Sequence, residues 1–117
     1  MTAAPLPPDR NVRVALIGCG RISGSHVAAI DRIHGLDLVA ASDVEIDRAR
    51  ALAEVRGIPA FRTVEELLAG VDCDVVAICT PSGLHPAHGI LAARACKHVV
   101  TEKPMAISLA DADALVQ

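Results

Sequence analysis

Two glycines separated by one residue follow an apolar stretch near the start of the chain. The segment 12–17 is almost entirely apolar and runs directly into Gly18-Cys19-Gly20, after which the sequence is compatible with a helix. A glycine at position 18 permits a sharp turn, and the missing side chain at Gly20 lets a diphosphate approach the backbone. The free N–H groups and positive dipole end of the following helix would face that anion. This order of strand, turn and helix predicts part of a dinucleotide site.

The glycine motif is incomplete, and by itself it is equally typical of a turn that binds nothing. Ser23 replaces the third glycine of the usual pattern, and Gly24 follows one residue late. A small side chain at position 23 still allows the helix to lie close to the strand. The interpretation as a nucleotide site therefore depends on residues elsewhere in the chain.

An aspartate ends the second predicted strand at the spacing expected of a ribose ligand. Asp43 lies a little over twenty residues after Gly20. A carboxylate there accepts hydrogen bonds from the diol of an adenosine ribose and repels a 2′-phosphate, which favours NAD over NADP. Two alternatives stay open, because Asp43 can also cap the next helix and Arg48 can accommodate the phosphate of NADP.

Two more polar segments follow predicted strands at the same edge of the sheet, where open α/β sheets bind ligands. Residues 80–85 follow the fourth strand, and residues 102–104 follow the fifth. An ammonium group on Lys103 could polarise a hydroxyl or carbonyl group while hydride moves to or from a nicotinamide. The alternatives are an ordinary strand-to-helix turn at 80–85 and a solvated surface lysine at position 103.

The elements that would position these groups alternate between strand and helix. Strands are predicted at 13–17, 36–42, 58–61, 74–80 and 98–101. Helices are predicted from Ser23 or Ser25 to residue 34 and at 45–56, 63–69, 86–95 and 108–117. Gly35 and Gly57 end the first two helices, and a capping box from Thr63 to Glu66 opens the third. The alternation demands parallel strands and right-handed crossovers. We predict an α/β fold, a doubly wound Rossmann sheet, over residues 12–117. The strand order 3-2-1-4-5 follows by analogy with other dinucleotide-binding folds.

Composition excludes several classes of function. The net charge of −3 with dispersed arginines offers no patch for nucleic acid or a membrane surface. The chain has no tyrosine for a short-chain dehydrogenase, and neither of its two lysines lies in a P-loop motif. The four cysteines form no CxxC pair, which is typical of reduced thiols in a cytoplasmic protein. Residues 1–11 lack an apolar segment, so we expect a flexible arm rather than a signal peptide.

Three motifs together resemble the N-terminal domain of the Gfo/Idh/MocA oxidoreductases. They are GCGRIS at 18–23, TPSGLHP at 80–86 and TEKPMA at 101–106, and the resemblance extends from about residue 12 to residue 117. Within the family, the motif sequences GCGRISGSH and TPSGLHP are most similar to those of UDP-N-acetylglucosaminuronate 3-dehydrogenases. The resemblance implies an NAD-dependent dehydrogenase that oxidises a secondary hydroxyl group of a sugar or sugar nucleotide.

The resemblance also implies roles for individual residues. It implies NAD contacts from Gly18, Cys19, Gly20, Arg21 and Ile22 at the pyrophosphate, from Asp43 at the adenosine ribose, from Thr80, Pro81, Ser82 and His85 near the nicotinamide, and from Glu102 and Lys103 at the nicotinamide ribose and reacting carbon. Lys103 is implied as the catalytic lysine. No metal site is expected, because helix spacing and core burial account for Cys79, His85 and His88.

Members of that family continue into a second domain that binds the sugar and supplies a histidine, and this sequence stops before it. We therefore expect a cofactor-binding domain that is inactive alone and that needs the further domain for its substrate. Apolar surface left bare near the fifth strand and final helix would favour a homo-oligomer. The alternative is a non-catalytic NAD-binding or assembly module.

Overall fold

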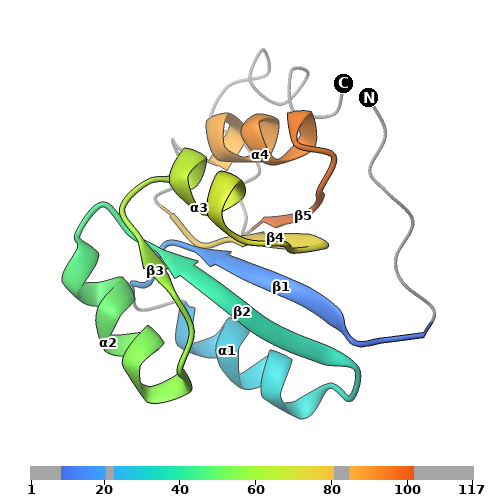
Figure 1. Cartoon of the computed structure of the whole chain (residues 1–117). Helices are drawn as coiled ribbons and strands as arrows, with labels where there is room; N and C mark the ends of the chain where they lie inside the picture. The colour runs from blue at the N-terminus through green and yellow to red at the C-terminus, as the bar shows by residue number, and fades with distance from the viewer. Residues whose placement is uncertain (1–8, 21–22, 81–84, 102–117) are drawn as a thin grey trace.

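An open parallel sheet with helices on both faces forms the structure, a computed structural model that describes residues 9–20, 23–80 and 85–101 (Figure 1). The strands are β1 (Val12–Ile17), β2 (Leu36–Ser42), β3 (Ala60–Phe61), β4 (Val75–Ile78) and β5 (His98–Thr101). The helices are α1 (Ser23–Arg32), α2 (Ile46–Arg56), α3 (Val64–Gly70) and α4 (His85–Arg94). All pairs are parallel in the order β3-β2-β1-β4-β5, which confirms the predicted Rossmann architecture.

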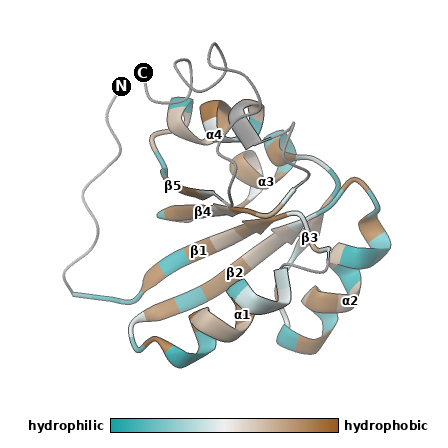
Figure 2. Cartoon of the chain, turned by 180° about the vertical axis from the view of Figure 1, so that it is seen from behind, coloured by the Kyte–Doolittle hydropathy of each residue, from teal (hydrophilic) through white to brown (hydrophobic). Residues whose placement is uncertain are grey.

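The sheet is buried on both faces because consecutive strand residues point to opposite sides. One core layer, against α3 and α4, contains Ala15, Ile17, Ala40, Val64, Leu67, Val76, Ile78 and Ala92. The other layer, against α1 and α2, contains Val14, Leu16, Ile30, Leu38, Ala41, Ala49 and Ala77. Hydrophobic and hydrophilic segments alternate along α1 and α2 in Figure 2, as expected of helices that bury one side only.

Helix ends follow the chemistry expected from the sequence. Gly57 adopts a left-handed conformation (φ 67°) and closes α2 with a hydrogen bond from its N–H group to the carbonyl oxygen of Ala53. The Thr63 hydroxyl accepts a hydrogen bond of 3.1 Å from the N–H group of Glu66 and so caps α3. Both predicted helix boundaries are therefore confirmed at these residues.

Three elements are shorter than predicted, and a fourth cannot be compared. The strand predicted at 74–80 extends only over Val75–Ile78. The strand predicted at 58–61 pairs only over Ala60–Phe61, because the N–H group of Ile58 is bonded to α2 and Pro59 has no N–H group to donate. The helix predicted to reach residue 34 ends at Arg32. The helix predicted at 108–117 lies outside the described residues. Within the described residues, no helix is both long enough and apolar enough to cross a bilayer.

Charged side chains connect the residues before β1 to the start of β4. Arg10 donates two hydrogen bonds of 2.8 and 3.0 Å to the two carboxylate oxygens of Asp74, which also accepts a bond of 2.9 Å from the N–H group of Arg13. Asn11 donates to the carboxylate of Asp37. Of the arm expected at 1–11, the described residues 10 and 11 thus contact the sheet edge opposite the glycine turn.

These bonds make the stability of the fold depend on pH at the acid end. The guanidinium of Arg10, and then the N–H group of Arg13, hold the pKa of Asp74 well below its usual value of 3.8. A carboxylate with a lowered native pKa contributes stability above its unfolded pKa and loses it as the pH falls toward the native pKa.

We expect Asp74→Asn to lower the free energy of unfolding by about 1–2 kcal/mol at pH 7. The difference from the parent should shrink as the pH falls below about 4, because Asp74 then takes up a proton in the unfolded parent before it does so in the folded parent. Urea unfolding at several pH values measures both effects. Asp72→Asn is the matched control, since the Asp72 side chain is 90% exposed and should change stability little. A constant difference from pH 7 to pH 2 would contradict the assignment.

Candidate functional site

The turn after β1 needs a glycine at its first position for reasons internal to the fold. Gly18 has φ +91°, and a Cβ atom there would lie 2.7 Å from the backbone nitrogen of Thr80 and 2.8 Å from the carbonyl carbon of Cys79. The N–H group of Gly18 also donates to the carbonyl oxygen of Ser42. The ends of β1, β2 and β4 therefore meet at this glycine.

The second glycine of the turn is different, because nothing in the described part of the chain requires it. A Cβ atom on Gly20 would meet no atom within 4 Å, and Gly20 is not among the residues with a positive φ. Its carbonyl oxygen accepts bonds from both the N–H group and the hydroxyl of Ser23. The serine that replaces the third glycine thus closes the first turn of α1. None of the described residues fills the space in front of Gly20.

Asp43 connects the glycine turn to the loop that follows β2. Its side chain is buried, and its two carboxylate oxygens each accept a bond of 2.9 Å, one from the N–H group of Cys19 and one from that of Glu45. Glu45, and not Asp43, occupies the N-cap position of α2. The alternative that Asp43 is a simple helix cap is therefore wrong. A carboxylate that accepts two bonds keeps further lone pairs for a ligand.

Cys19 lies between the two glycines as a protonated thiol. Its sulfur donates to the carbonyl oxygen of Ser42 at 3.5 Å. Burial, and then the nearby charge of Asp43, raises the pKa of the thiol to about 11. The N–H group of Cys19 donates to Asp43, so both hydrogen-bond donors of this residue, the N–H group and the thiol, are engaged within the chain.

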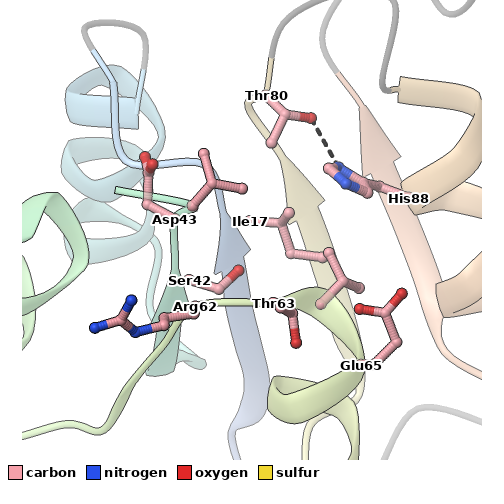
Figure 3. A pocket seen from close by; sticks show the side chains of 10 residues that line it. Ile17, Ser42, Asp43, Arg62, Thr63, Glu65, Thr80 and His88 are labelled. Carbon is pink, nitrogen blue, oxygen red and sulfur yellow. Dashed lines mark hydrogen bonds between the residues drawn. The ribbon is translucent and has the colours of Figure 1, made fainter. Parts of the chain in front are cut away.

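A pocket of about 160 Å³ opens beside Asp43 at the carboxyl edge of the sheet (Figure 3). It is lined by Ile17, Ser42, Asp43, Val44, Arg62, Thr63, Val64, Glu65, Thr80 and His88. Figure 3 shows Asp43 on one side and Thr80 and His88 on the other, with Ile17 between them. The Thr80 hydroxyl lies 3.0 Å from Nδ1 of His88, which fixes the side chain at the end of β4.

The structure brings together those predicted site residues that it describes. Gly18, Cys19, Gly20, Asp43 and Thr80 all lie at the carboxyl ends of β1, β2 and β4. The predicted residues Arg21, Ile22, Pro81, Ser82, Glu102 and Lys103 lie outside the described residues, and of His85 only the place at the start of α4 is described.

Among the pocket residues that were not predicted as site residues, three carry ionisable side chains, namely Arg62, Glu65 and His88. A signal existed for Arg62, since it directly follows the third strand and the carboxyl ends of all parallel strands share one edge. His88 lies inside a helix, where only the docking of α4 against β4 turns it toward the pocket.

We expect Gly18→Ala to lower the free energy of unfolding by roughly 3 kcal/mol, because the new Cβ atom collides with backbone and the positive φ is strained. Gly24→Ala is the matched control. A Cβ atom there meets open space inside α1, so stability should rise by about 0.5–1 kcal/mol. Thermal or urea unfolding compares the two. Equal effects would contradict the close approach at Gly18.

We expect Cys19 to resist alkylation at pH 8 in the folded chain, since its thiol stays protonated. The rate should rise as the pH approaches 11, whereas in urea the same cysteine should react at pH 8 as an ordinary thiol. Mass spectrometry of the Cys19 peptide after timed iodoacetamide treatment measures the rates. Rapid labelling of the folded chain at pH 8 would contradict the raised pKa.

Comparison with known proteins identifies the family of this domain. Residues 12–117 match the family GFO_IDH_MocA, described as an oxidoreductase family with an NAD-binding Rossmann fold. Among curated proteins, the myo-inositol 2-dehydrogenase of Thermotoga maritima is 36% identical over 107 residues, which are 91% of this chain and 32% of that protein. The D-glucoside 3-dehydrogenase of Escherichia coli is 36% identical over 110 residues, covering 92% of this chain and 30% of that protein.

Solved structures give the same result. The WlbA dehydrogenase of Chromobacterium violaceum, in complex with NADH and UDP-GlcNAcA, superposes with a TM-score of 0.91 at 37% identity and covers 99% of this chain and 34% of its own. The WlbA dehydrogenase of Bordetella pertussis, with the same two ligands, superposes with a TM-score of 0.87 at 39% identity. The match covers 92% of this chain and 33% of that protein. This chain thus spans about one third of the length of these relatives. It belongs to the Gfo/Idh/MocA oxidoreductase family and forms the NAD-binding Rossmann domain of that family.

Proposed function

We propose that this chain is the cofactor-binding part of an NAD-dependent dehydrogenase that acts on a secondary hydroxyl group of a sugar or sugar nucleotide. Gly20 is the observation that carries the proposal. No contact among the described residues requires a glycine there, and a side chain at this position would meet none of their atoms within 4 Å beside the start of α1. A diphosphate that lies against the backbone accounts for both facts.

The adenosine half of NAD fits the pocket beside the turn. Asp43 is buried and held by two backbone donors, so its carboxylate is already oriented for a ribose diol. The adenine ring would lie in the pocket against Ile17, Val44 and Thr80, where the apolar side chains exclude water from its faces. Val44 is 81% exposed, and burial of this side chain against the adenine would favour binding.

The remaining predicted contacts complete the proposed site. The pyrophosphate would be bound by the turn Gly18-Cys19-Gly20 together with Arg21 and Ile22. The side nearer the nicotinamide would be contacted by Thr80, Pro81, Ser82 and His85. Glu102 would hold the nicotinamide ribose. When bound, NAD supplies a hydride acceptor. The ammonium group of Lys103 would polarise the reacting hydroxyl and stabilise its oxygen, while the proton passes to a base that the proposed further domain would supply.

The substrate class follows from the relatives. The two WlbA structures that resemble this chain contain UDP-GlcNAcA, and the curated relatives include an inositol dehydrogenase and a glucoside dehydrogenase. These names support a sugar or polyol hydroxyl, and UDP-N-acetylglucosaminuronate is the specific substrate that we propose. Because the chain spans about one third of those proteins, the proposed whole enzyme binds its substrate with a further domain.

We expect Gly20→Ala to weaken NADH binding at least about tenfold while leaving the unfolding curve close to that of the parent. A methyl group at this position occupies the proposed place of the diphosphate but touches no other part of the described chain. NADH fluorescence titration measures the affinity, and urea unfolding measures stability.

Adenosine provides the matched control ligand for this variant. It carries no phosphate, so Gly20→Ala should bind it as the parent does. Asp43→Ala is a poorer test, because removal of the carboxylate also releases the N–H groups of Cys19 and Glu45. Unchanged NADH affinity of Gly20→Ala would overturn the proposed diphosphate site, and failure of the parent to bind NADH would overturn the proposed function.

A further inference from the structure

An arginine that the sequence analysis did not single out lies next to Asp43. β3 pairs with β2 so that Phe61 is opposite Ser42, and the N–H group of Asp43 donates to the carbonyl oxygen of Phe61 at 3.1 Å. Asp43 directly follows Ser42, and Arg62 directly follows Phe61. Because neighbouring strands lie about 4.8 Å apart, the backbones of Asp43 and Arg62 are close to each other. Figure 3 shows the Arg62 side chain on the Asp43 side of the pocket, away from Thr80 and His88.

The two charged groups differ in their burial and in the bonds that they make within the chain. Asp43 is buried and fixed by the N–H groups of Cys19 and Glu45. Arg62 is exposed, and within the described residues no carboxylate lies within 4.0 Å of its guanidinium. Glu65 is the other charged residue that lines the pocket. The guanidinium of Arg62 is therefore available to a ligand beside Asp43.

The arginine that spacing alone suggested for this role is placed elsewhere. Arg48 forms an ion pair with Glu45 at 3.3 Å on the first turns of α2, and both side chains are more than half exposed. Arg48 does not line the pocket, whereas Arg62 does. The two arginines thus form a natural pair of test and control positions.

We propose that Arg62 sets the selectivity of this site between NAD and NADP. The inference rests on the proposed function, in which Asp43 binds the adenosine ribose. A 2′-phosphate on that ribose carries a charge of about −1.5 to −2 and is repelled by Asp43. The adjacent guanidinium offsets this repulsion, because it pairs with phosphate oxygens through two parallel hydrogen bonds. The site therefore prefers NAD and still accepts NADP as a weaker second cofactor.

The test compares Arg62→Gln with Arg48→Gln in the full chain. Dissociation constants for NADH and NADPH are measured by fluorescence titration, and circular dichroism verifies the fold. The parent should bind NADPH more weakly than NADH, but by less than about a thousandfold. Arg62→Gln should increase the NADPH/NADH ratio of dissociation constants about tenfold, the effect of one lost charge-assisted pair. Arg48→Gln should leave the ratio within about twofold.

A pair of adenosine phosphates isolates the 2′-position. Displacement of NADH by 2′,5′-ADP should weaken in Arg62→Gln, whereas displacement by 5′-AMP should change much less. Because the proposed contact is an exposed ion pair, 0.5 M salt should reduce the difference between parent and Arg62→Gln for 2′,5′-ADP.

Three results would overturn the inference. They are an unchanged NADPH/NADH ratio in Arg62→Gln, an equal change in Arg48→Gln, and NADPH binding more than about a thousandfold weaker than NADH in the parent. Each of these leaves the proposed function intact, since NADH still binds. Absence of NADH binding to the parent would instead overturn both proposals.

Discussion

The carboxylate of Asp43 is the contact on which the site depends. It accepts one bond from the turn after β1 and one from the loop after β2, while the backbone of the same residue donates to the end of β3. Three loops that are distant in sequence are thereby fixed relative to one another. A buried carboxylate is stable in this position only because backbone donors replace the water that it loses. The same bonds fix its position at the wall of the pocket.

The double burial of the sheet explains why polar groups gather at one edge. Helices α1 and α2 cover one face and α3 and α4 cover the other, so neither face can hold a polar ligand (Figure 1). All strands are parallel, and their carboxyl ends therefore meet at the same edge. At that edge Gly18 lets β1 and β4 approach each other closely. At the opposite edge, two hydrogen bonds from Arg10 to Asp74 connect the residues before β1 to the start of β4.

Within the glycine turn, two identical residues have different reasons to be glycine. At Gly18 a side chain would collide with the backbone of the chain itself, whereas at Gly20 it would meet no atom of the described residues within 4 Å. The first glycine serves the fold, and for the second we propose a ligand as the reason. Ser23 stands at the position of the third glycine, and its hydroxyl donates a hydrogen bond to the carbonyl oxygen of Gly20 at the start of α1.

The sequence alone determined the fold class and the places of Gly18, Gly20 and Asp43 at the ends of predicted strands, because hydrophobic periodicity, glycine turns and caps are local and repeat along the chain. The strand order was predicted only by analogy with other dinucleotide-binding folds. Gly57 and Thr63 show this, since each acts on its own helix end. Only the tertiary structure decided that Asp43 bonds to two loops, that Arg62 and not Arg48 lies beside it, and that His88 faces Thr80. These are contacts between separate elements, and they depend on how strands pair and how helices dock, which no local pattern encodes.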